Sequence, residues 1–242
     1  MNNLTKKEKR ILKKEEKLAE KETKRRQMIF KKYFLWFGVF ILLSAAIFGF
    51  VKIAPDLAKN QTASLASTVD ENDWFKGGES APVALVEYSD FQCPACAFYA
   101  PLVKDLAEEF GNGLKIVYRH FPLNQIHKNA DLAARAAEAA GQQGKFWEMH
   151  DLIFDNQKQW SEIRKTEAEK IFAGFAEKLG LDAEKFIFDV QSKKVEKAVA
   201  EDLASGLASR IQGTPTFFLN NKKIQNPRNY EELKNLVLTS KN

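Results

Sequence analysis

The sequence predicts an α/β domain that is interrupted by a long helical insertion and preceded by a single transmembrane helix. Three observations support this fold class. A strand–helix–strand pattern precedes residue 122, helical patterns fill the stretch from Asn129 to about Ile211, and an uncharged apolar run lies near the N-terminus. The 242 residues are enough for one sizeable domain and an accessory segment. The hydrophobic content of 45% is that of a globular protein.

The first segment, residues 1–32, is strongly basic. It holds 13 of the 37 Lys and Arg residues and 5 of the 32 Asp and Glu residues, which leaves 24 basic and 27 acidic residues in the rest of the chain. The net charge of +5 therefore belongs to this tail, and nucleic acid is not expected as a partner. Because basic residues that flank a membrane span tend to stay inside the cell, we expect a cytoplasmic tail.

Residues 33–53 are predicted to form the transmembrane helix. Their core, "YFLWFGVFILLSAAIFGFV", carries no charge and lies between Lys32 and Lys52. Nineteen residues at a rise of about 1.5 Å cover most of a bilayer core of about 30 Å. A cleavable signal peptide fits less well, because its apolar region is usually about 7–15 residues and is followed closely by a cleavage site. The pattern predicts a single-pass protein of the cell membrane that contacts lipid through residues 33–53, with its C-terminal domain outside the cytoplasm.

Residues 54–80 are small and polar and end in two glycines, which predicts a flexible linker to a domain over residues 81–242. Within this domain, "PVALVEYS" is rich in strand formers and predicts a buried strand. Residues 97–110 predict a helix, and "LKIVYRHF" predicts a second strand. Two strands and a helix within about forty residues predict a βαβ unit with a right-handed crossover.

The helical insertion is predicted over about residues 124–210. The Ala-rich stretch "ADLAARAAEAAGQQG" ends at glycine, and "KFWEMHDLIF" continues the apolar spacing of a helix. Strand character returns in "PTFFL", after which Asn220 and Asn221 predict a turn into a short partner strand. The stretch "NYEELKNLVL" predicts a closing amphipathic helix. Two sheet-forming halves therefore flank the helical insertion.

The only two cysteines of the chain, Cys93 and Cys96, lie between the first predicted strand and the helix after it. Pro94 suits the first helical position, where its missing N–H costs nothing, and Ala95 completes a Cys-Pro-Ala-Cys sequence. Cys93 then occupies the N-cap, where unpaired N–H groups and the helix dipole favour a thiolate. A thiolate at this position has a lowered pKa and is both a nucleophile and a good leaving group. Cys96 lies on the same helix face within disulfide range, and we expect it to be more buried and to resolve a mixed disulfide.

Two other uses of the cysteine pair are less favoured. A structural disulfide over a four-residue loop would remove little entropy from the unfolded chain. A zinc site needs four ligands, and only His120, His127 and His150 could add to the thiols, with no second ligand pair at a characteristic spacing. No flavin or nicotinamide motif is present in the sequence, so neither a metal nor a cofactor is expected.

From about Gly77 to its end, the sequence resembles the DsbA-like branch of the thioredoxin superfamily. The resemblance lies in "APVALVEYSDFQCPACAFY", "VYRHFPL", "HKNADLAARAAEAAGQQGKFWEMHDLIF" and "GTPTFFLNN". It implies a thioredoxin fold with a helical insertion, which agrees with the split pattern described above. It also implies that Cys93 is the attacking thiol and that Cys96 is the resolving one.

The resemblance implies roles for three further residues. Pro215 matches the cis-proline that faces the cysteines in this family, although only about 5–6% of X–Pro bonds in folded proteins are cis. Thr214 is expected to offer its backbone to a bound substrate strand. Glu87 matches a buried acid behind the disulfide, which would assist proton transfer to Cys96. The alternative for Glu87 is an edge carboxylate that reaches water.

The function that this resemblance implies is a membrane-tethered thiol–disulfide oxidoreductase. It would introduce disulfides into reduced or unfolded exported proteins, and a membrane redox partner would reoxidise its cysteine pair. Ala95 stands where strongly oxidising members of the family often carry His, so it adds no charge that would stabilise the thiolate. A reductase or isomerase therefore remains an alternative. A non-catalytic, peptide-binding holdase is a third possibility, but binding alone needs no dithiol.

Overall fold

In the computed structural model, the chain forms two units, residues 1–61 and residues 62–242. The structure describes residues 17, 20–21, 23–26, 28, 31–32, 36–44, 48 and 64–240. Most of the predicted tail (1–32), most of the predicted span (33–53) and the predicted linker up to residue 63 lie outside this described part. Within the described part, no helix combines the length and the apolar character needed to cross a membrane.

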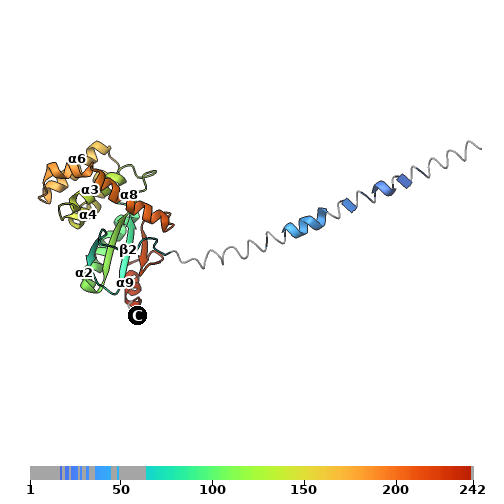
Figure 1. Cartoon of the computed structure of the whole chain (residues 1–242), viewed down its shortest axis with the longest axis horizontal. Helices are drawn as coiled ribbons and strands as arrows, with labels where there is room; N and C mark the ends of the chain where they lie inside the picture. The colour runs from blue at the N-terminus through green and yellow to red at the C-terminus, as the bar shows by residue number, and fades with distance from the viewer. Residues whose placement is uncertain are drawn as a thin grey trace, which may run out of the picture. The chain divides into compact units, whose positions relative to one another are not determined.

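A five-stranded mixed sheet is the centre of the second unit (Figure 1). The strand order is β1-β3-β2-β4-β5, with β2 and β3 parallel and the other neighbours antiparallel. The strands are β1 (Trp74–Gly77), β2 (Ala84–Ser89), β3 (Lys115–His120), β4 (Thr216–Leu219) and β5 (Lys222–Lys223). Helix α2 (Pro94–Phe110) connects β2 to β3, which confirms the predicted βαβ unit.

The helical insertion predicted over residues 124–210 lies between β3 and β4. Figure 1 shows its larger helices gathered at one end of the sheet, whereas α2 and α9 (Tyr230–Thr239) lie beside the strands. The insertion consists of α3 (Ala130–Gly141), α4 (Phe146–Asp155), α5 (Gln157–Trp160), α6 (Lys165–Lys178), α7 (Ala183–Val190) and α8 (Lys193–Ala208). The prediction of two sheet-forming halves around a helical block is therefore confirmed.

The expectation that all of residues 54–80 form a linker was wrong. Residues 74–77 form strand β1, which pairs with β3 at the edge of the sheet. The indole ring of Trp74 stacks on Phe146 with ring centroids 4.7 Å apart, and its N–H donates to Glu138 Oε1 at 2.7 Å. The strand has only four residues and no apolar alternation, so its pairing with β3 stabilises the extended conformation more than its own sequence does.

Arg119, a buried arginine in β3, binds the segment that precedes β1. Its Nε and Nη2 donate to the two carboxylate oxygens of Asp73 at 2.7 and 2.9 Å. Its Nη1 donates to Ser67 O at 3.0 Å and to the Tyr88 hydroxyl at 2.9 Å, and its Nη2 donates to Thr68 O at 2.9 Å. Residues 67–73 are therefore part of the folded domain, because they satisfy a buried cation.

The alternation of side chains along β2 decides which of them lie beneath α2. Leu85 packs with Val103 and Leu106 of α2 in one apolar cluster, whereas Val86 belongs to a cluster on the other face of the sheet. Side chains two residues apart in a strand share a face. Glu87 therefore faces α2, the helix that carries the cysteines.

Candidate active site

Cys93 is the N-cap residue of α2, with φ −72° and ψ 123°, and Pro94 is the first helical residue, as predicted. Hydrogen bonds from both sides fix this loop. The Cys93 N–H donates to Asp90 O at 3.0 Å, and Gln157 Nε2 donates to the carbonyls of Phe91 and Cys93 at 2.8 and 3.0 Å. The helical insertion, which contributes Gln157, thus helps to hold the start of α2 in place.

The thiol of Cys93 lies at the edge of the site, and 8% of the residue is exposed. As a thiol it donates to Thr214 O at 3.5 Å. The pKa of Cys93 is lowered to about 5, chiefly by a hydrogen bond from the Cys96 thiol, while burial opposes the shift and the N–H groups of Cys96 and Ala95 add to it. Cys93 is therefore a thiolate at neutral pH in the reduced protein.

Cys96 differs from Cys93 although it lies only three residues further along the helix. It is fully buried, and its Sγ accepts a hydrogen bond from the Asp90 N–H at 3.5 Å. Burial raises its pKa well above the ordinary range, and the negative charges of Cys93 and Glu87 raise it further. The prediction that Cys96 is the more buried thiol is confirmed. Cys96 must gain a proton whenever its disulfide bond to Cys93 opens.

Glu87 is buried, with 3% of the residue exposed, and its Oε1 has no hydrogen-bond partner in the protein. Burial raises the pKa of Glu87 to about 7, the nearby Ser89 hydroxyl opposes the shift, and the charge of Cys93 adds to it. The Ser89 hydroxyl and the Tyr118 hydroxyl are likewise buried without a protein partner. The expected burial of Glu87 is confirmed, and its carboxyl group can exchange a proton near neutral pH.

The loop before β4 lies opposite Cys93. The Thr214–Pro215 peptide bond is cis, as expected from the resemblance. Pro215 is buried and Thr214 is half-buried. Asn226 Nδ2 donates to Pro215 O at 2.8 Å and so ties this loop to the chain that follows β5. Pro94 and Ala95 are exposed beside it, which leaves the cysteine end of α2 open to another chain.

A polar network behind the loop that leads to Cys93 was not predicted. The carboxylate of Asp90, which is buried, accepts hydrogen bonds from Gln92 N at 2.7 Å, Leu123 N at 2.8 Å and His127 Nδ1 at 2.7 Å. The side chain of Gln92 in turn accepts from Asn129 N at 2.8 Å. These bonds join the loop to the chain that enters the insertion. The only signal in the sequence was the placement of two polar residues just before Cys93.

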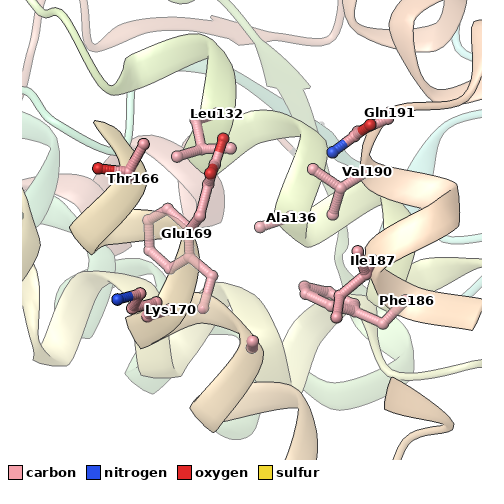
Figure 2. Close-up of a pocket in the computed structure, with 11 residues that line it drawn as sticks. Leu132, Ala136, Thr166, Glu169, Lys170, Phe186, Ile187, Val190 and Gln191 are labelled. Atoms are coloured by element: carbon pink, nitrogen blue, oxygen red, sulfur yellow. The ribbon is translucent and has the colours of Figure 1, made fainter. Parts of the chain in front are cut away.

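The described part of the chain contains no group of three or more His, Cys, Asp and Glu side chains placed to hold a metal ion. It does contain a cavity of about 330 Å³ within the helical insertion, between α3, α6 and α7 (Figure 2). Apolar side chains such as Leu132, Phe186, Ile187 and Val190 line much of it. None of the predicted site residues is among its lining residues.

The mixed sheet, its flanking helices and the dithiol at the start of α2 define a thioredoxin-like protein. A family model described as thioredoxin matches residues 69–238, which is most of the chain. The chain therefore belongs to the thioredoxin family.

Solved structures with the same fold include DsbA proteins. BdbD from Bacillus subtilis, in its oxidised form, is 23% identical, with a TM-score of 0.66 over 75% of this chain and 99% of BdbD. The α-DsbA1 protein of Wolbachia pipientis is 18% identical, with a TM-score of 0.64 over 72% and 92% of the two chains. A thioredoxin-like oxidoreductase from Silicibacter pomeroyi is 26% identical, with a TM-score of 0.59 over 75% and 97%. The fold of this chain is thus DsbA-like.

Curated relatives that match by sequence are much longer proteins. The Na(+)/H(+) antiporter NhaA 1 of Salinispora arenicola is 39% identical over 170 residues, and the NhaA antiporter of Herminiimonas arsenicoxydans is 38% identical over 179. These matches cover 70% and 72% of this chain but only 25% and 27% of the antiporters. The chain thus spans about a quarter of the length of these relatives.

Proposed function

We propose that this chain is a thiol–disulfide oxidoreductase of the DsbA type that uses Cys93 and Cys96. The observation that supports this function most directly is the contrast between the two thiols. One has a pKa of about 5 at the edge of the site, and the other is fully buried with a raised pKa. A low-pKa thiol is a good leaving group in disulfide exchange, and a buried neighbour is protected from outside reagents.

The oxidising reaction proceeds in two exchanges. A substrate thiolate attacks Cys93 Sγ, the Cys93–Cys96 bond breaks, and Cys96 leaves with the electron pair and takes up a proton. A second substrate thiolate then attacks the substrate sulfur of the mixed disulfide, and Cys93 leaves as a thiolate. The substrate loses two electrons and the protein gains them. Glu87, with a pKa of about 7, is suited to supply the proton that Cys96 requires.

The loop at Thr214 and Pro215 is the proposed place for the substrate backbone. Thr214 O lies 3.5 Å from Cys93 Sγ, so a peptide bound along this loop would bring its own sulfur close to Cys93. Backbone hydrogen bonds to an extended peptide give affinity without demanding one particular sequence. This mode of binding suits an enzyme that acts on many reduced or unfolded proteins.

The direction we propose is oxidation of exported proteins outside the cytoplasm. Stabilising the thiolate of the reduced form makes the disulfide a stronger oxidant, and structural disulfides form outside the cytosol. Membrane anchoring by residues 33–53 is part of this proposal and rests on the apolar run and its basic flank. Related segments within proteins named Na(+)/H(+) antiporters are consistent with such anchoring. A membrane redox partner would then reoxidise the cysteine pair.

Two measurements test this function. Purified oxidised protein should restore activity to reduced, unfolded ribonuclease, and the Cys93→Ser variant should not. In cells, trapping free thiols with an alkylating mass tag should find the pair mostly as a disulfide. A pair that is mostly reduced at steady state would reject the oxidase and favour the reductase or isomerase.

A holdase is the second candidate function, and the apolar cavity in Figure 2 is the observation that favours it. Ile187, which lines this cavity, and Phe188, the next residue, are 52% and 73% exposed, which is unusual for large apolar side chains. The Cys93→Ser/Cys96→Ser double variant separates the two functions. A holdase would still suppress aggregation of an unfolded protein at full strength in this variant, whereas an oxidoreductase would lose its activity.

A further inference from the structure

A narrow cavity leads from the surface to Glu87. Its inner end is formed by the buried residues Glu87 and Tyr118, and its outer end by Lys76, Lys104 and Asp151. The side chains at the outer end are 27%, 47% and 24% exposed, respectively. The free volume is about 10 Å³, at the lower limit of what one water molecule requires. The cavity therefore connects a buried acid with solvent through a space of about one water.

The inner end of this cavity carries polar atoms that no protein group satisfies. Glu87 Oε1 and Tyr118 Oη are both buried without a hydrogen-bond partner in the protein. Glu87 and Tyr118 are directly paired residues of β2 and β3, so their side chains emerge side by side from the sheet. Buried polar atoms of this kind are normally hydrogen-bonded to ordered water, because leaving them unpaired costs about 1–3 kcal/mol each.

His150, in helix α4 of the insertion, lines the cavity next to Asp151. Its Nδ1 lies 2.9 Å from Asp151 Oδ1, and the other Asp151 oxygen binds Lys104 Nζ at 3.0 Å and lies 3.8 Å from Lys76 Nζ. Because Asp151 accepts the Nδ1 proton, the other ring nitrogen, Nε2, is the one that can accept a proton.

The charges at the outer end favour a transient rather than a permanent proton on His150. Burial lowers the pKa of His150, so the ring is neutral at pH 7. Burial opposes the ionisation of Asp151, but the hydrogen bond from His150 and the two lysines lower its pKa to about 2. Asp151 therefore stays charged and orients the imidazole, and His150 is the group at this end that can both take up and release a proton.

We propose that this cavity holds a water molecule hydrogen-bonded to Glu87 and Tyr118, and that protons pass between this water and solvent by way of His150. The use of this route rests on the proposed function. When a thiolate opens the Cys93–Cys96 bond, Cys96 takes the electron pair and receives a proton from Glu87. Glu87 is then reprotonated through the water, and one proton enters from solvent. When the disulfide forms again, the same proton leaves by the reverse path.

Other titratable groups surround this route but do not lie along it. Asp90 is bound to His127, and His120 is bound to Glu138, so both are held by partners outside the cavity. The ionisable groups that act on Glu87, Tyr118 or His150 from nearby are Cys93, Cys96, Asp90, His120, Lys76 and Asp151, and the Ser89 hydroxyl also acts on Glu87 and Tyr118.

The test measures how fast dithiothreitol opens the Cys93–Cys96 disulfide between pH 5 and pH 9, corrected for the thiolate fraction of the reagent. The wild-type rate should fall as pH rises through the pKa of Glu87, because the proton donor is lost. His150→Ala and His150→Gln should each slow the reaction by about 10-fold or more above pH 7, where Glu87 is ionised and must first take up a proton through the route; such an effect is modest for general acid–base catalysis. Imidazole added to the solution should restore the rate of His150→Ala, because it enters the space left by the side chain.

Two controls separate this route from a structural role of His150. Phe154→Ala removes a buried ring from the same helix one turn later, and it should keep the wild-type pH profile and gain nothing from imidazole. In a Glu87→Gln background, His150→Ala should cause no further loss. An equal loss in that background, or no imidazole rescue in a folded His150→Ala protein, would overturn the proposal.

The outcomes also distinguish this inference from the proposed function. A protein that shows the expected pattern with dithiothreitol but cannot oxidise ribonuclease would reject the proposed function and keep the proton route. A crystal structure at about 1.5 Å resolution gives an independent check. It should contain an ordered water within hydrogen-bond distance of Glu87 Oε1 and Tyr118 Oη, and a dry cavity would reject the route.

Discussion

The two sides of the cysteine pair present one chemical group in two opposite environments. On the outer side, Cys93 is at the start of a helix next to the Thr214 carbonyl and the exposed Pro94 and Ala95. On the inner side, Cys96 is fully buried, and the negative charge of Glu87 adds to the effect of burial in raising its pKa. The pKa is lowered at one thiol and raised at the other, although the two cysteines are only three positions apart in the sequence. The reactivity of the motif therefore depends on where the helix begins relative to the sheet.

The largest expected effect comes from removing each thiol in turn. Cys93→Ser should abolish disulfide exchange, because the nucleophile and leaving group is lost. Cys96→Ser cannot form the Cys93–Cys96 bond and so cannot oxidise a substrate. Its Cys93 thiolate can still attack a substrate disulfide and displace a substrate thiolate, and the resulting mixed disulfides should accumulate because the Cys96 thiol that would break them is missing. Non-reducing gels of cell extracts, with the double variant as control, measure this difference. Mixed disulfides that accumulate on Cys96 in Cys93→Ser would reverse the two roles.

The next largest effect concerns alkylation of the reduced protein. Iodoacetamide should modify Cys93 with a midpoint near pH 5, whereas Cys96 should stay unmodified at neutral pH. At pH 7 we expect a rate ratio above about 100-fold, because thiolate is the reactive form and Cys96 is almost entirely protonated. Mass spectrometry of digests at intervals assigns each rate to its residue. Similar rates for both cysteines would mean that their environments do not differ as described.

Glu87→Gln tests the inner side through stability. The folded pKa of Glu87, about 7, is above its ordinary value, so its contribution to stability is complete below about pH 4 and is lost as pH rises through 7. Gln does not ionise, so the Glu87→Gln protein does not lose this stability as the pH rises. From pH 4 to pH 8, the free energy of unfolding of the variant should therefore increase relative to that of the wild type by up to about 3 kcal/mol. Urea unfolding at several pH values measures the difference. If the difference in free energy of unfolding between variant and wild type did not change with pH, the Glu87 carboxylate would be exposed to water and not buried.

A smaller effect should distinguish the reduced from the oxidised protein. The folded pKa of Cys93, about 5, is below its ordinary value of about 8.5, so the thiolate stabilises the reduced fold above that ordinary value and this stability is lost as pH falls through 5. From pH 7 to pH 5 the reduced protein should lose about 2 kcal/mol relative to the oxidised one. Paired urea titrations with and without reductant measure this change, and Cys93→Ser should not show it.

Features set by neighbouring residues in the chain could be predicted from the sequence. The strand before Cys93, the proline after it and the glycine after Phe110 together place α2 and its N-cap close to where the structure has them. The helical insertion was likewise evident, because apolar spacing and glycine stops are local signals. The roles of Glu87, Thr214 and Pro215 came from the family resemblance, not from periodicity.

Features set by distant contacts could not be predicted. Strand β1 depends on pairing with β3, about forty residues later in the chain, and "WFKG" alone carries no strand pattern. The cavity beside Glu87 requires His150 of the insertion to return to the sheet, a contact between residues 63 positions apart. Helical periodicity placed His150 on a helix, but it did not indicate what that helix packs against.

The contacts of Arg119 also limit how far the domain can be truncated from its N-terminal side. A fragment that begins at residue 81 would retain both cysteines, Glu87 and the Thr214 loop, yet it would leave a buried guanidinium without Asp73. Breaking a buried ion pair on one side typically costs about 3–5 kcal/mol, a large part of the stability of a small domain. A fragment that begins at residue 62, the start of the second unit, keeps these contacts. Joined at this point to a different N-terminal segment, residues 62–242 should fold as an independent domain.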